Sequence, residues 1–264
     1  MTHCTEVIQE TTRKGLKKAV RALVARALSI GNLDLHSVKW RLDSSGAARH
    51  AEVSAILSVE DPSGGGNDYL LDLTTSLIKR CKQVRLPLLE ERKAPEIVKI
   101  WPGEHYRLLS ALVQELSPNR VVEVGTYTGL SALAMLPDLK RGARLTTFDV
   151  IAWNEIPDSF LRASDFADAV LTQILGDLSK PAVAKQHAAV LQEADLLFVD
   201  GPKDGVFEKR LLENFTSCLK PGALLVFDDI RVWNMLTIWH AIAQPKLDIT
   251  SFGHWSGTGM VQWP

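Results

Sequence analysis

The sequence predicts an α/β fold in which helices cover a mostly parallel sheet. Short apolar runs typical of strands alternate with helical segments from about residue 120 onward. Such alternation is typical of a parallel sheet that is buried on both faces. The last segments break the alternation and indicate a closing antiparallel hairpin. Strands are expected at 120–125, 145–150, 170–175, 194–200 and 223–228, the hairpin at 247–252 and 259–263, and helices at 104–116 and near 130–136, 182–192 and 206–219.

The chain before the sheet is expected to be mainly helical. Apolar residues recur at helical spacing over 13–30 and again over 69–84, and a glycine-rich stretch at 61–67 separates the two segments. We therefore predict an N-terminal helical appendage over residues 1–94, with a role as a lid, in dimerisation or in binding a partner. The main domain is then expected over residues 95–264.

The composition is that of a globular protein without a charge bias. Of the 264 residues 46% are hydrophobic, and 30 basic residues against 31 acidic residues give a net charge of -1. This balance gives no support for nucleic acid as a partner. No apolar run approaches the roughly 18 residues of a membrane span. The three cysteines are widely spaced, which argues against a disulfide framework. We expect a cytoplasmic protein that binds neither nucleic acid nor membranes.

The turn that contains Gly125 and Gly129 is expected to bind a ligand. It follows the first strand and precedes a helix, and glycine lets the backbone approach a ligand closely. An acid near the strand end, Glu123, would repel the pyrophosphate of a dinucleotide, which is favoured at a bare helix N-terminus. The sulfonium and ammonium groups of S-adenosylmethionine both suit an acid. The pattern favours this cofactor, and the structural alternative is a buried acid satisfied by backbone donors.

Two further acids follow the next strands. Asp149 ends the second expected strand, where a carboxylate can accept both ribose hydroxyls of S-adenosylmethionine or, equally well, of NAD. Asp177 follows the third strand and can accept the adenine amino group.

Three aspartates end two later strands. Asp200 ends one of them, and Asp228 and Asp229 end the other. Because strand ends converge at one edge of a parallel sheet, we expect the three carboxylates within a few ångströms of one another, where they would raise one another's pKa. A hard cation such as Mg²⁺, which takes oxygen ligands, would compensate them. The alternative is that one acid caps a helix and another faces solvent.

Lys203 lies in the loop Asp200-Gly-Pro-Lys-Asp-Gly205 and can reach the same edge. Its amine can deprotonate a hydroxyl group, or it can form a salt bridge with Asp200 or Asp204. Loop statistics alone favour the salt bridge.

An aromatic cluster opens the helix expected at 104–116. Trp101, His105 and Tyr106 either line a substrate pocket or pack against the neighbouring core. Packing is the commoner role of such a cluster.

These motifs follow one another in a characteristic order. They are Glu123-Val-Gly-Thr-Tyr-Thr-Gly-Leu-Ser131, Asp149, Gly176-Asp177, Phe198-Val-Asp200, Lys203, Leu219-Lys-Pro-Gly and Phe227-Asp-Asp229. In this order they resemble class I S-adenosylmethionine-dependent methyltransferases, and among these the catechol O-methyltransferase-like enzymes. The resemblance covers about residues 100 to 264. It implies a Rossmann-like, doubly wound sheet of seven strands with an antiparallel C-terminal hairpin.

The resemblance also implies roles for individual residues. The cofactor would be held by Glu123, Gly125, Tyr127, Gly129, Ser131, Asp149 and Asp177. Mg²⁺ would be bound by Asp200, Asp228 and Asp229, with Lys203 as the general base. The chain departs from the family at Asp229, where an asparagine is common, and at Gly201-Pro202, where the catechol enzymes have bulkier groups. No acid in the C-terminal strands matches one that would hold a second catechol hydroxyl.

The resemblance implies an O-methyltransferase that acts on a hydroxyl group of a small molecule with the help of Mg²⁺. Metal-independent methylation of a natural product or a sugar is the nearest alternative. From other classes, an NAD-dependent oxidoreductase and a protein that binds the cofactor without turnover stay open. The expected partners are a hydroxylated small-molecule acceptor and, in a homodimer, a second copy of the chain.

Overall fold

The computed structural model describes residues 68–264 except 101–102, 253 and 255. Contacts divide the chain into Met1–Arg49 and His50–Pro264, and the described residues all belong to the second unit. The helix predicted at 13–30 and the break predicted at 61–67 lie outside the described residues. The predicted appendage is described only from residue 68 onward, so its boundary at residue 94 stays a prediction.

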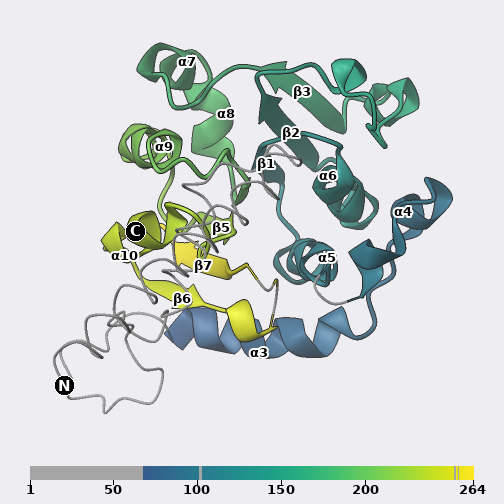
Figure 1. The fold of residues 1–264 in the computed structure, drawn as a ribbon, viewed down its shortest axis with the longest axis horizontal. Coiled ribbons are helices and arrows are strands. Elements are labelled where there is room, and N and C mark those ends of the chain that lie inside the picture. The colour runs from purple at the N-terminus through teal and green to yellow at the C-terminus, as the bar shows by residue number, and fades with distance from the viewer. Residues whose placement is uncertain (1–67, 101–102, 253, 255) are drawn as a thin grey trace, which may run out of the picture. The chain divides into compact units, whose positions relative to one another are not determined.

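A seven-stranded sheet in the order β3-β2-β1-β4-β5-β7-β6 forms the centre of the second unit (Figure 1). Strands β1 to β5 pair in parallel, whereas β7 runs antiparallel to both β5 and β6. This confirms the predicted mostly parallel sheet and its antiparallel C-terminal hairpin. The strands are β1 (Arg120–Val124), β2 (Arg144–Asp149), β3 (Leu171–Leu175), β4 (Leu196–Val199), β5 (Leu224–Asp228), β6 (Lys246–Asp248) and β7 (Thr258–Gln262).

Helices cover both faces of this sheet (Figure 1). One hydrophobic cluster contains buried side chains of α3 (Asp68–Cys81), α4 (Pro87–Glu91), α5 (His105–Leu116) and α6 (Leu130–Met135). The other contains those of α8 (Ala188–Glu193), α9 (Phe207–Phe215) and α10 (Met235–Ala241), with α7 (Pro181–Gln186) at its margin. The short 3₁₀ helices are η2 (Glu96–Lys99), η3 (Leu136–Asp138), η4 (Trp153–Glu155), η5 (Ala163–Phe166) and η6 (Thr250–Phe252).

The apolar run of β1 shows why the sheet is buried on both sides. Val121 belongs to the cluster under α5 and α6, whereas Val122 and Val124 belong to the opposite cluster. Successive side chains of a strand point to opposite faces, so a strand covered on both faces needs apolar residues at consecutive positions. The single buried acid in this strand, Glu123, is therefore exceptional.

The end of the predicted appendage shares its core with the sheet. Leu70 and Leu77 of α3 are fully buried in the same cluster as Leu112 of α5. At the rim of this contact, Nη2 of Arg80 lies 2.6 Å from Oε2 of Glu115. Helix α3 therefore supports the fold of the second unit.

Several elements differ from their predicted extents, and the helices predicted at 69–84 and near 206–219 end at Cys81 and Phe215. The strand predicted at 247–252 ends at Asp248, because its carboxylate accepts a 2.9 Å hydrogen bond from the Thr250 amide and starts the 3₁₀ turn η6. The helix predicted near 182–192 is two helices, α7 and α8, separated at His187. Among the described residues, no helix has the length and apolarity needed to cross a membrane.

Candidate functional site

A cavity of about 660 Å³ opens at the carboxyl ends of β1 to β4. Ligands of open α/β sheets bind at this edge. Six of the residues predicted to act in the site line the cavity: Gly125, Tyr127, Asp149, Asp177, Asp200 and Lys203. The remaining wall residues are Val124, Phe148, Val150, Gly176, Ser179, Gly201, Pro202, Asp204, Val206, Phe207 and Arg210.

The turn after β1 requires both of its glycines. Gly125 has a φ of +102°, and a Cβ there would lie 2.1 Å from the carbonyl oxygen of Asp200. Gly129 has a φ of +81°, and a Cβ there would collide with the side chain of Leu161. Between them Tyr127 also has a positive φ, of 39°, which is uncommon for a residue with a side chain. The turn is thus held in one shape, with Tyr127 exposed at its tip.

The carboxylate of Asp149 organises this turn. Its Oδ2 accepts hydrogen bonds of 2.9 Å from the amides of both Thr126 and Tyr127. Its Oδ1 accepts hydrogen bonds from the amides of Val150 at 2.7 Å and Ile151 at 3.1 Å. Asp149 therefore lines the cavity as predicted, and it also fixes the backbone on either side of the opening.

Glu123 lies behind the turn and does not line the cavity. Its side chain is fully buried, and one oxygen accepts a hydrogen bond from the hydroxyl of Ser131. Burial raises the pKa of Glu123 from its ordinary 4.5 to about 7, although the bond from Ser131 opposes the shift. The two residues predicted to contact the cofactor thus contact each other in this structure.

Asp177 lies at the end of β3, on the far side of the cavity. Its Oδ1 accepts hydrogen bonds from the amide of Ser179 at 3.0 Å and from the hydroxyl of Ser179 at 2.6 Å. Its Oδ2 lies 3.6 Å from Nζ of Lys180. Oδ1 is thus occupied by hydrogen bonds within the local turn, whereas Oδ2 faces the exposed Lys180.

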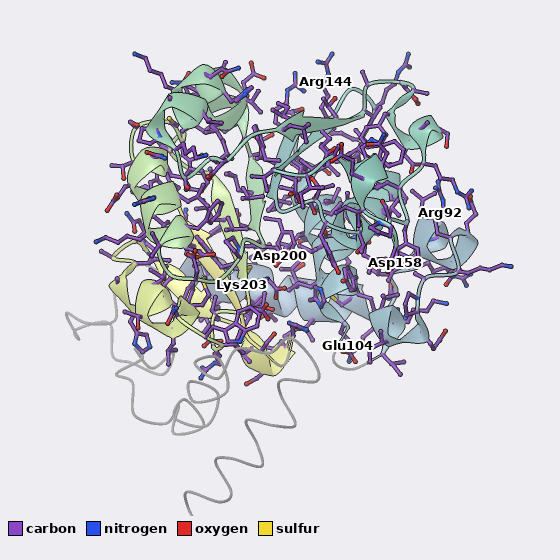
Figure 2. All side chains as sticks on the ribbon, turned by 45° about the horizontal axis from the view of Figure 1, so that its top comes forward. Arg92, Glu104, Arg144, Asp158, Asp200 and Lys203 are labelled. Carbon is purple, nitrogen blue, oxygen red and sulfur yellow. The ribbon has the colours of Figure 1, made fainter. Side chains whose placement is uncertain are left out.

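Lys203 lies between two of the three predicted metal ligands. Its ammonium contacts Oδ1 of Asp200 and lies 2.9 Å from Oδ2 of Asp229. Figure 2 shows Asp200 and Lys203 side by side near the middle of the molecule. Burial lowers the pKa of Lys203, but the carboxylates of Asp200, Asp229 and Asp228 outweigh it and hold the pKa above its ordinary value. Lys203 is therefore a buried cation at neutral pH, as the salt-bridge alternative predicts.

The loop that carries Lys203 is held from helix α9. Glu208 is 1% exposed, and its carboxylate accepts hydrogen bonds from the amides of Lys203 at 2.7 Å and Gly205 at 2.9 Å. Lys203 itself has a φ of +61°. Burial raises the pKa of Glu208 above its ordinary value. The sequence interpretation missed Glu208, whose only signal is an acid in the first turn of the following helix.

Asp200, Asp228 and Asp229 at the ends of β4 and β5 form what we call the acidic edge. His254 lies beside it and was also missed by the sequence interpretation. Its Nδ1 lies 3.3 Å from Oδ1 of Asp228, 3.7 Å from Oδ1 of Asp229 and 2.5 Å from the hydroxyl oxygen of Ser256. Burial lowers the pKa of His254, but its contact with Asp228 and the charges of Asp228 and Asp229 outweigh burial, so the pKa is raised. A histidine in the C-terminal segment gives no spacing signal that links it to acids at two strand ends.

The aromatic residues at the start of α5 pack against this histidine. The rings of His105 and His254 have centroids 4.4 Å apart, and the rings of His105 and Tyr106 have centroids 3.9 Å apart. Burial, followed by the charges of Asp200 and Asp228, raises the pKa of Tyr106. His105 and Tyr106 thus form a wall of the acidic edge, while Trp101 lies outside the described residues.

The side chains at this edge suit a divalent cation. Asp228, Asp229 and His254 each offer one ligand atom, and these atoms lie within 4.8 Å of one another. Asp228 is only 6% exposed, and its Oδ1 faces Nδ1 of His254 at 3.3 Å. A buried carboxylate is costly unless a cation compensates it. Asp200, the third predicted ligand, contacts Lys203.

Comparison with known proteins agrees with this geometry. Residues 122–230 match the family model described as a methyltransferase domain. Over this segment the chain is similar to methyltransferase domains. It runs from β1 to the residue after Asp229 and so contains every predicted site residue. The predicted resemblance to class I S-adenosylmethionine-dependent methyltransferases is confirmed.

Two curated relatives are O-methyltransferases. The chain is 28% identical over 134 residues to catechol O-methyltransferase B of Danio rerio. These aligned residues make up 47% of this chain and 47% of that protein. It is 27% identical over 198 residues to caffeoyl-CoA O-methyltransferase 2 of Zea mays, covering 70% of this chain and 69% of that protein. The chain thus spans about half the length of the catechol relative. It shares its fold with the SAH-bound methyltransferase of Podospora anserina, at 18% identity and a TM-score of 0.51 over 80% of this chain and 100% of that one.

Proposed function

We propose that the protein transfers the methyl group of S-adenosylmethionine to a hydroxyl oxygen of a small molecule, with the assistance of a divalent cation. One observation carries the proposal: Asp200 and Lys203 line the cavity, and the ammonium of Lys203 also contacts Asp229 of the acidic edge. A cofactor in the cavity would therefore present its methyl group toward the edge. The named O-methyltransferase relatives support transfer to oxygen.

The residues of the turn and of the next two strand ends would hold the cofactor. Gly125 leaves room for close approach, and Asp149 keeps the amides of Thr126 and Tyr127 in place beside its own carboxylate. That carboxylate would accept the ribose hydroxyls. Asp177, across the cavity, would accept the adenine amino group through the oxygen that is not bonded to Ser179.

The acidic edge would activate the acceptor. A phenol with a pKa of ~10 is about three units above neutral pH, so its ionisation costs roughly 4 kcal/mol. A divalent cation, when bound, stabilises the resulting oxyanion. Lys203 would be the general base, but its ammonium now compensates Asp200 and Asp229. It can accept a proton only once those carboxylates are compensated in another way.

The same ion pairs favour a second candidate function, methylation without a metal. The Lys203 ammonium already supplies one positive charge to two of the three acids. In that case Lys203 stays protonated and stabilises the oxyanion directly, and another group takes the proton. His254, beside Asp228 and Asp229, is one titratable candidate.

The acceptor class, the oligomeric state and the cellular location of the protein are also proposed. We expect a hydroxylated small molecule as the acceptor, and we expect a homodimer. We also propose a cytoplasmic location, on the odd number and wide spacing of the three cysteines in the sequence.

Cofactor-coupled turnover tests the proposal. The purified full-length chain is incubated with S-adenosylmethionine and a panel of hydroxylated metabolites, and S-adenosylhomocysteine is quantified with and without chelator. We expect turnover of at least one phenolic or polyhydroxylated acceptor, reduced by chelator and restored by divalent cation. Gly125→Val is the control, because a Cβ at this position collides with the Asp200 backbone. A chain whose melting temperature rises with NAD and not with S-adenosylmethionine would contradict the proposal.

A further inference from the structure

A buried ion pair lies outside the cavity, between the end of helix α4 and the segment that joins β2 to β3. The guanidinium of Arg92 donates two hydrogen bonds to Asp165, from Nη2 to Oδ1 at 2.6 Å and from Nη1 to Oδ2 at 3.3 Å. The two side chains are 5% and 6% exposed. Figure 2 shows Arg92 near the margin of the molecule, apart from Asp200 and Lys203. Because two planar groups meet through two parallel bonds, the pair fixes the direction of its partners as well as their distance.

The same guanidinium is linked to the turn after β1 through the backbone of Phe160. Nη1 of Arg92 donates a hydrogen bond of 3.2 Å to the carbonyl oxygen of Phe160. The amide of Phe160 donates a hydrogen bond of 2.9 Å to the carbonyl oxygen of Thr128. Thr128 belongs to residues 125–129, which we call the cofactor turn. Two consecutive hydrogen bonds thus join Arg92 to this turn.

The next side chain of the segment packs directly on the turn. Leu161 is 4% exposed, and a Cβ at Gly129 would lie 2.3 Å from its Cγ. Gly129 has a positive φ and immediately precedes helix α6. Leu161 therefore restricts the turn at its last residue, while Phe160 holds it one residue earlier. Neither Phe160 nor Leu161 is among the described residues that line the cavity.

Asp165 also fixes the segment that carries these two contacts. Its Oδ2 accepts a hydrogen bond of 2.7 Å from the amide of Arg162, and its own amide donates one of 2.9 Å to the carbonyl oxygen of Arg162. These reciprocal bonds start the 3₁₀ helix η5. The carboxylate that binds Arg92 therefore also sets the course of the chain directly after Leu161.

We propose that the Arg92–Asp165 pair is a positioning element for the binding of S-adenosylmethionine. It holds residues 160–161 against the cofactor turn and so keeps the turn in its binding conformation from outside the cavity. The inference rests on the proposed cofactor site. A turn that is already ordered binds its ligand more tightly, because less conformational freedom is lost on binding. Arg92 belongs to the predicted appendage, so this part of the appendage acts on the cofactor site.

The backbone of the cofactor turn needs support from its surroundings. Tyr127 has a φ of 39°, and such a conformation persists only where neighbouring contacts impose it. Asp149 supplies such contacts on the cavity side, through the amides of Thr126 and Tyr127. Arg92 acts on the outer side, through the carbonyl oxygen of Thr128. Without Arg92 the turn keeps the first support and loses the second, so we expect weaker binding and not its abolition.

Calorimetry with S-adenosylhomocysteine tests the inference on the full-length chain without turnover. Arg92→Met should weaken binding about 3–30-fold, as for residues that act on a site without contacting the ligand. The matched control is Arg162→Met, which removes an ion pair with Glu91 between the same two segments, with side chains 56% and 55% exposed. This change leaves the backbone bonds of Arg162 in place and should alter the dissociation constant by less than about twofold. Equal affinities of the wild-type and Arg92→Met chains would overturn the inference.

Two further variants separate positioning from a general loss of stability. Arg92→Lys keeps the charge but lacks the planar fork that binds Asp165 and the Phe160 carbonyl together, so it should restore only part of the affinity. The double variant with Arg92→Met and Asp165→Asn should bind no more weakly than Asp165→Asn alone, because the two residues act as a unit. Additive losses of affinity would overturn the pairing.

Hydrogen exchange on the wild-type chain tests the same link without any variant. Because coupling between two sites is reciprocal, S-adenosylhomocysteine in the cavity should slow the exchange of the amides of Phe160 and Asp165 outside it. We expect exchange to slow at least about threefold, relative to the amide of Leu191 in α8 on the opposite face of the sheet. Unchanged exchange of both amides in the saturated protein would overturn the inference.

Exchange in the ligand-free chain distinguishes this inference from the proposed function. Arg92→Met should speed the exchange of the Phe160 amide and of the Gly129 amide, which donates within the turn to Thr126 at 2.8 Å. If these amides respond while the wild-type chain binds neither S-adenosylmethionine nor S-adenosylhomocysteine, the proposed function fails and the effect of the pair on the turn stands. If the wild-type chain transfers methyl groups while neither affinity nor exchange responds to Arg92→Met, the inference fails and the proposed function stands.

Discussion

The ammonium nitrogen of Lys203 lies 2.9 Å from Oδ2 of Asp229, and it also contacts Asp200 across the ends of β4 and β5. One buried cation thus joins two neighbouring strand ends at the edge of the methyltransferase cavity. The charge balance of the site depends on this contact before any ligand binds.

Replacing this cation should destabilise the metal-free protein. Lys203→Met removes the cation that compensates Asp200 and Asp229, whose side chains are 32% and 16% exposed. The loss of one partner from a fully buried pair costs about 3–5 kcal/mol in the free energy of unfolding, and we expect a smaller loss here because both carboxylates retain some contact with water. The raised pKa of Lys203 lies above its ordinary 10.5, so its stabilisation is fully present below pH 10.5 and is lost only as the pH rises beyond that value. Urea unfolding at pH 6 and pH 9 should therefore show similar losses.

The control for this prediction is Lys180→Met. Lys180 is 69% exposed and lies 3.6 Å from Asp177, so its loss should cost less than about 1 kcal/mol. Wild-type stability of the Lys203 variant at both pH values would mean that the two carboxylates are compensated by other groups.

Asp149 should contribute directly to cofactor binding. Asp149→Ala removes the proposed ribose acceptor and the hydrogen bonds that hold the amides of Thr126 and Tyr127. We expect the affinity for S-adenosylmethionine to fall by about 1.5–3 kcal/mol, as for charge-assisted hydrogen bonds. Isothermal calorimetry measures the change, with the exposed Asp72→Ala as control. An unchanged dissociation constant would remove Asp149 from the cofactor site.

Glu123 should make the stability of the cofactor-free protein depend on pH. Its pKa is raised to about 7 in the folded chain, so its contribution is fully present below pH 4.5 and is lost as the pH rises through 7. Glu123→Gln removes this titration. Relative to wild type, the variant should gain up to about 3 kcal/mol at pH 8 and almost nothing at pH 4.5.

Urea unfolding across this pH range measures the difference, and Glu213→Gln on the exposed face of α9 is the control. A stability difference that stays constant from pH 4.5 to pH 8 would show that Glu123 keeps its ordinary pKa in the folded chain.

Helix α3 should be needed for the stability of the sheet domain. Leu77 is fully buried in the cluster shared with α5, so Leu77→Ala should lower the free energy of unfolding by about 2–5 kcal/mol. The exposed Lys79→Ala on the same helix is the control and should shift it by about 0.5 kcal/mol at most. Equal free energies of unfolding for the two variants would show that α3 is not needed for the stability of the sheet domain.

The sequence predicts those parts of the site that depend on strand order. A parallel sheet brings the residues after β1, β2, β4 and β5 to one edge, and the structure indeed places Gly125, Asp149 and Asp200 around one cavity. Local apolar runs were sufficient for this, because strand periodicity and burial on two faces are encoded residue by residue.

Contacts between side chains of distant segments were not predictable in the same way. The sequence does not show that Glu123 bonds to Ser131 or that Glu208 holds the Lys203 amide. It shows still less that β7 and the segment before it carry His254 to Asp228. Such contacts depend on the packing of whole elements and on rotamers, whereas motifs report only spacing along the chain.

The position of Gly125 has a consequence for engineering the enzyme. The carbonyl oxygen of Asp200 occupies the space where a side chain at residue 125 would lie, so the cofactor turn and the acidic edge touch backbone to backbone. Substitutions at this backbone contact, which we call the seam, would change the binding of the methyl donor and of the acceptor together. A change of methyl donor is better sought at Asp177 and Val150 on the far wall, and a change of acceptor range at Tyr106. Each of these positions can be varied while the seam stays intact.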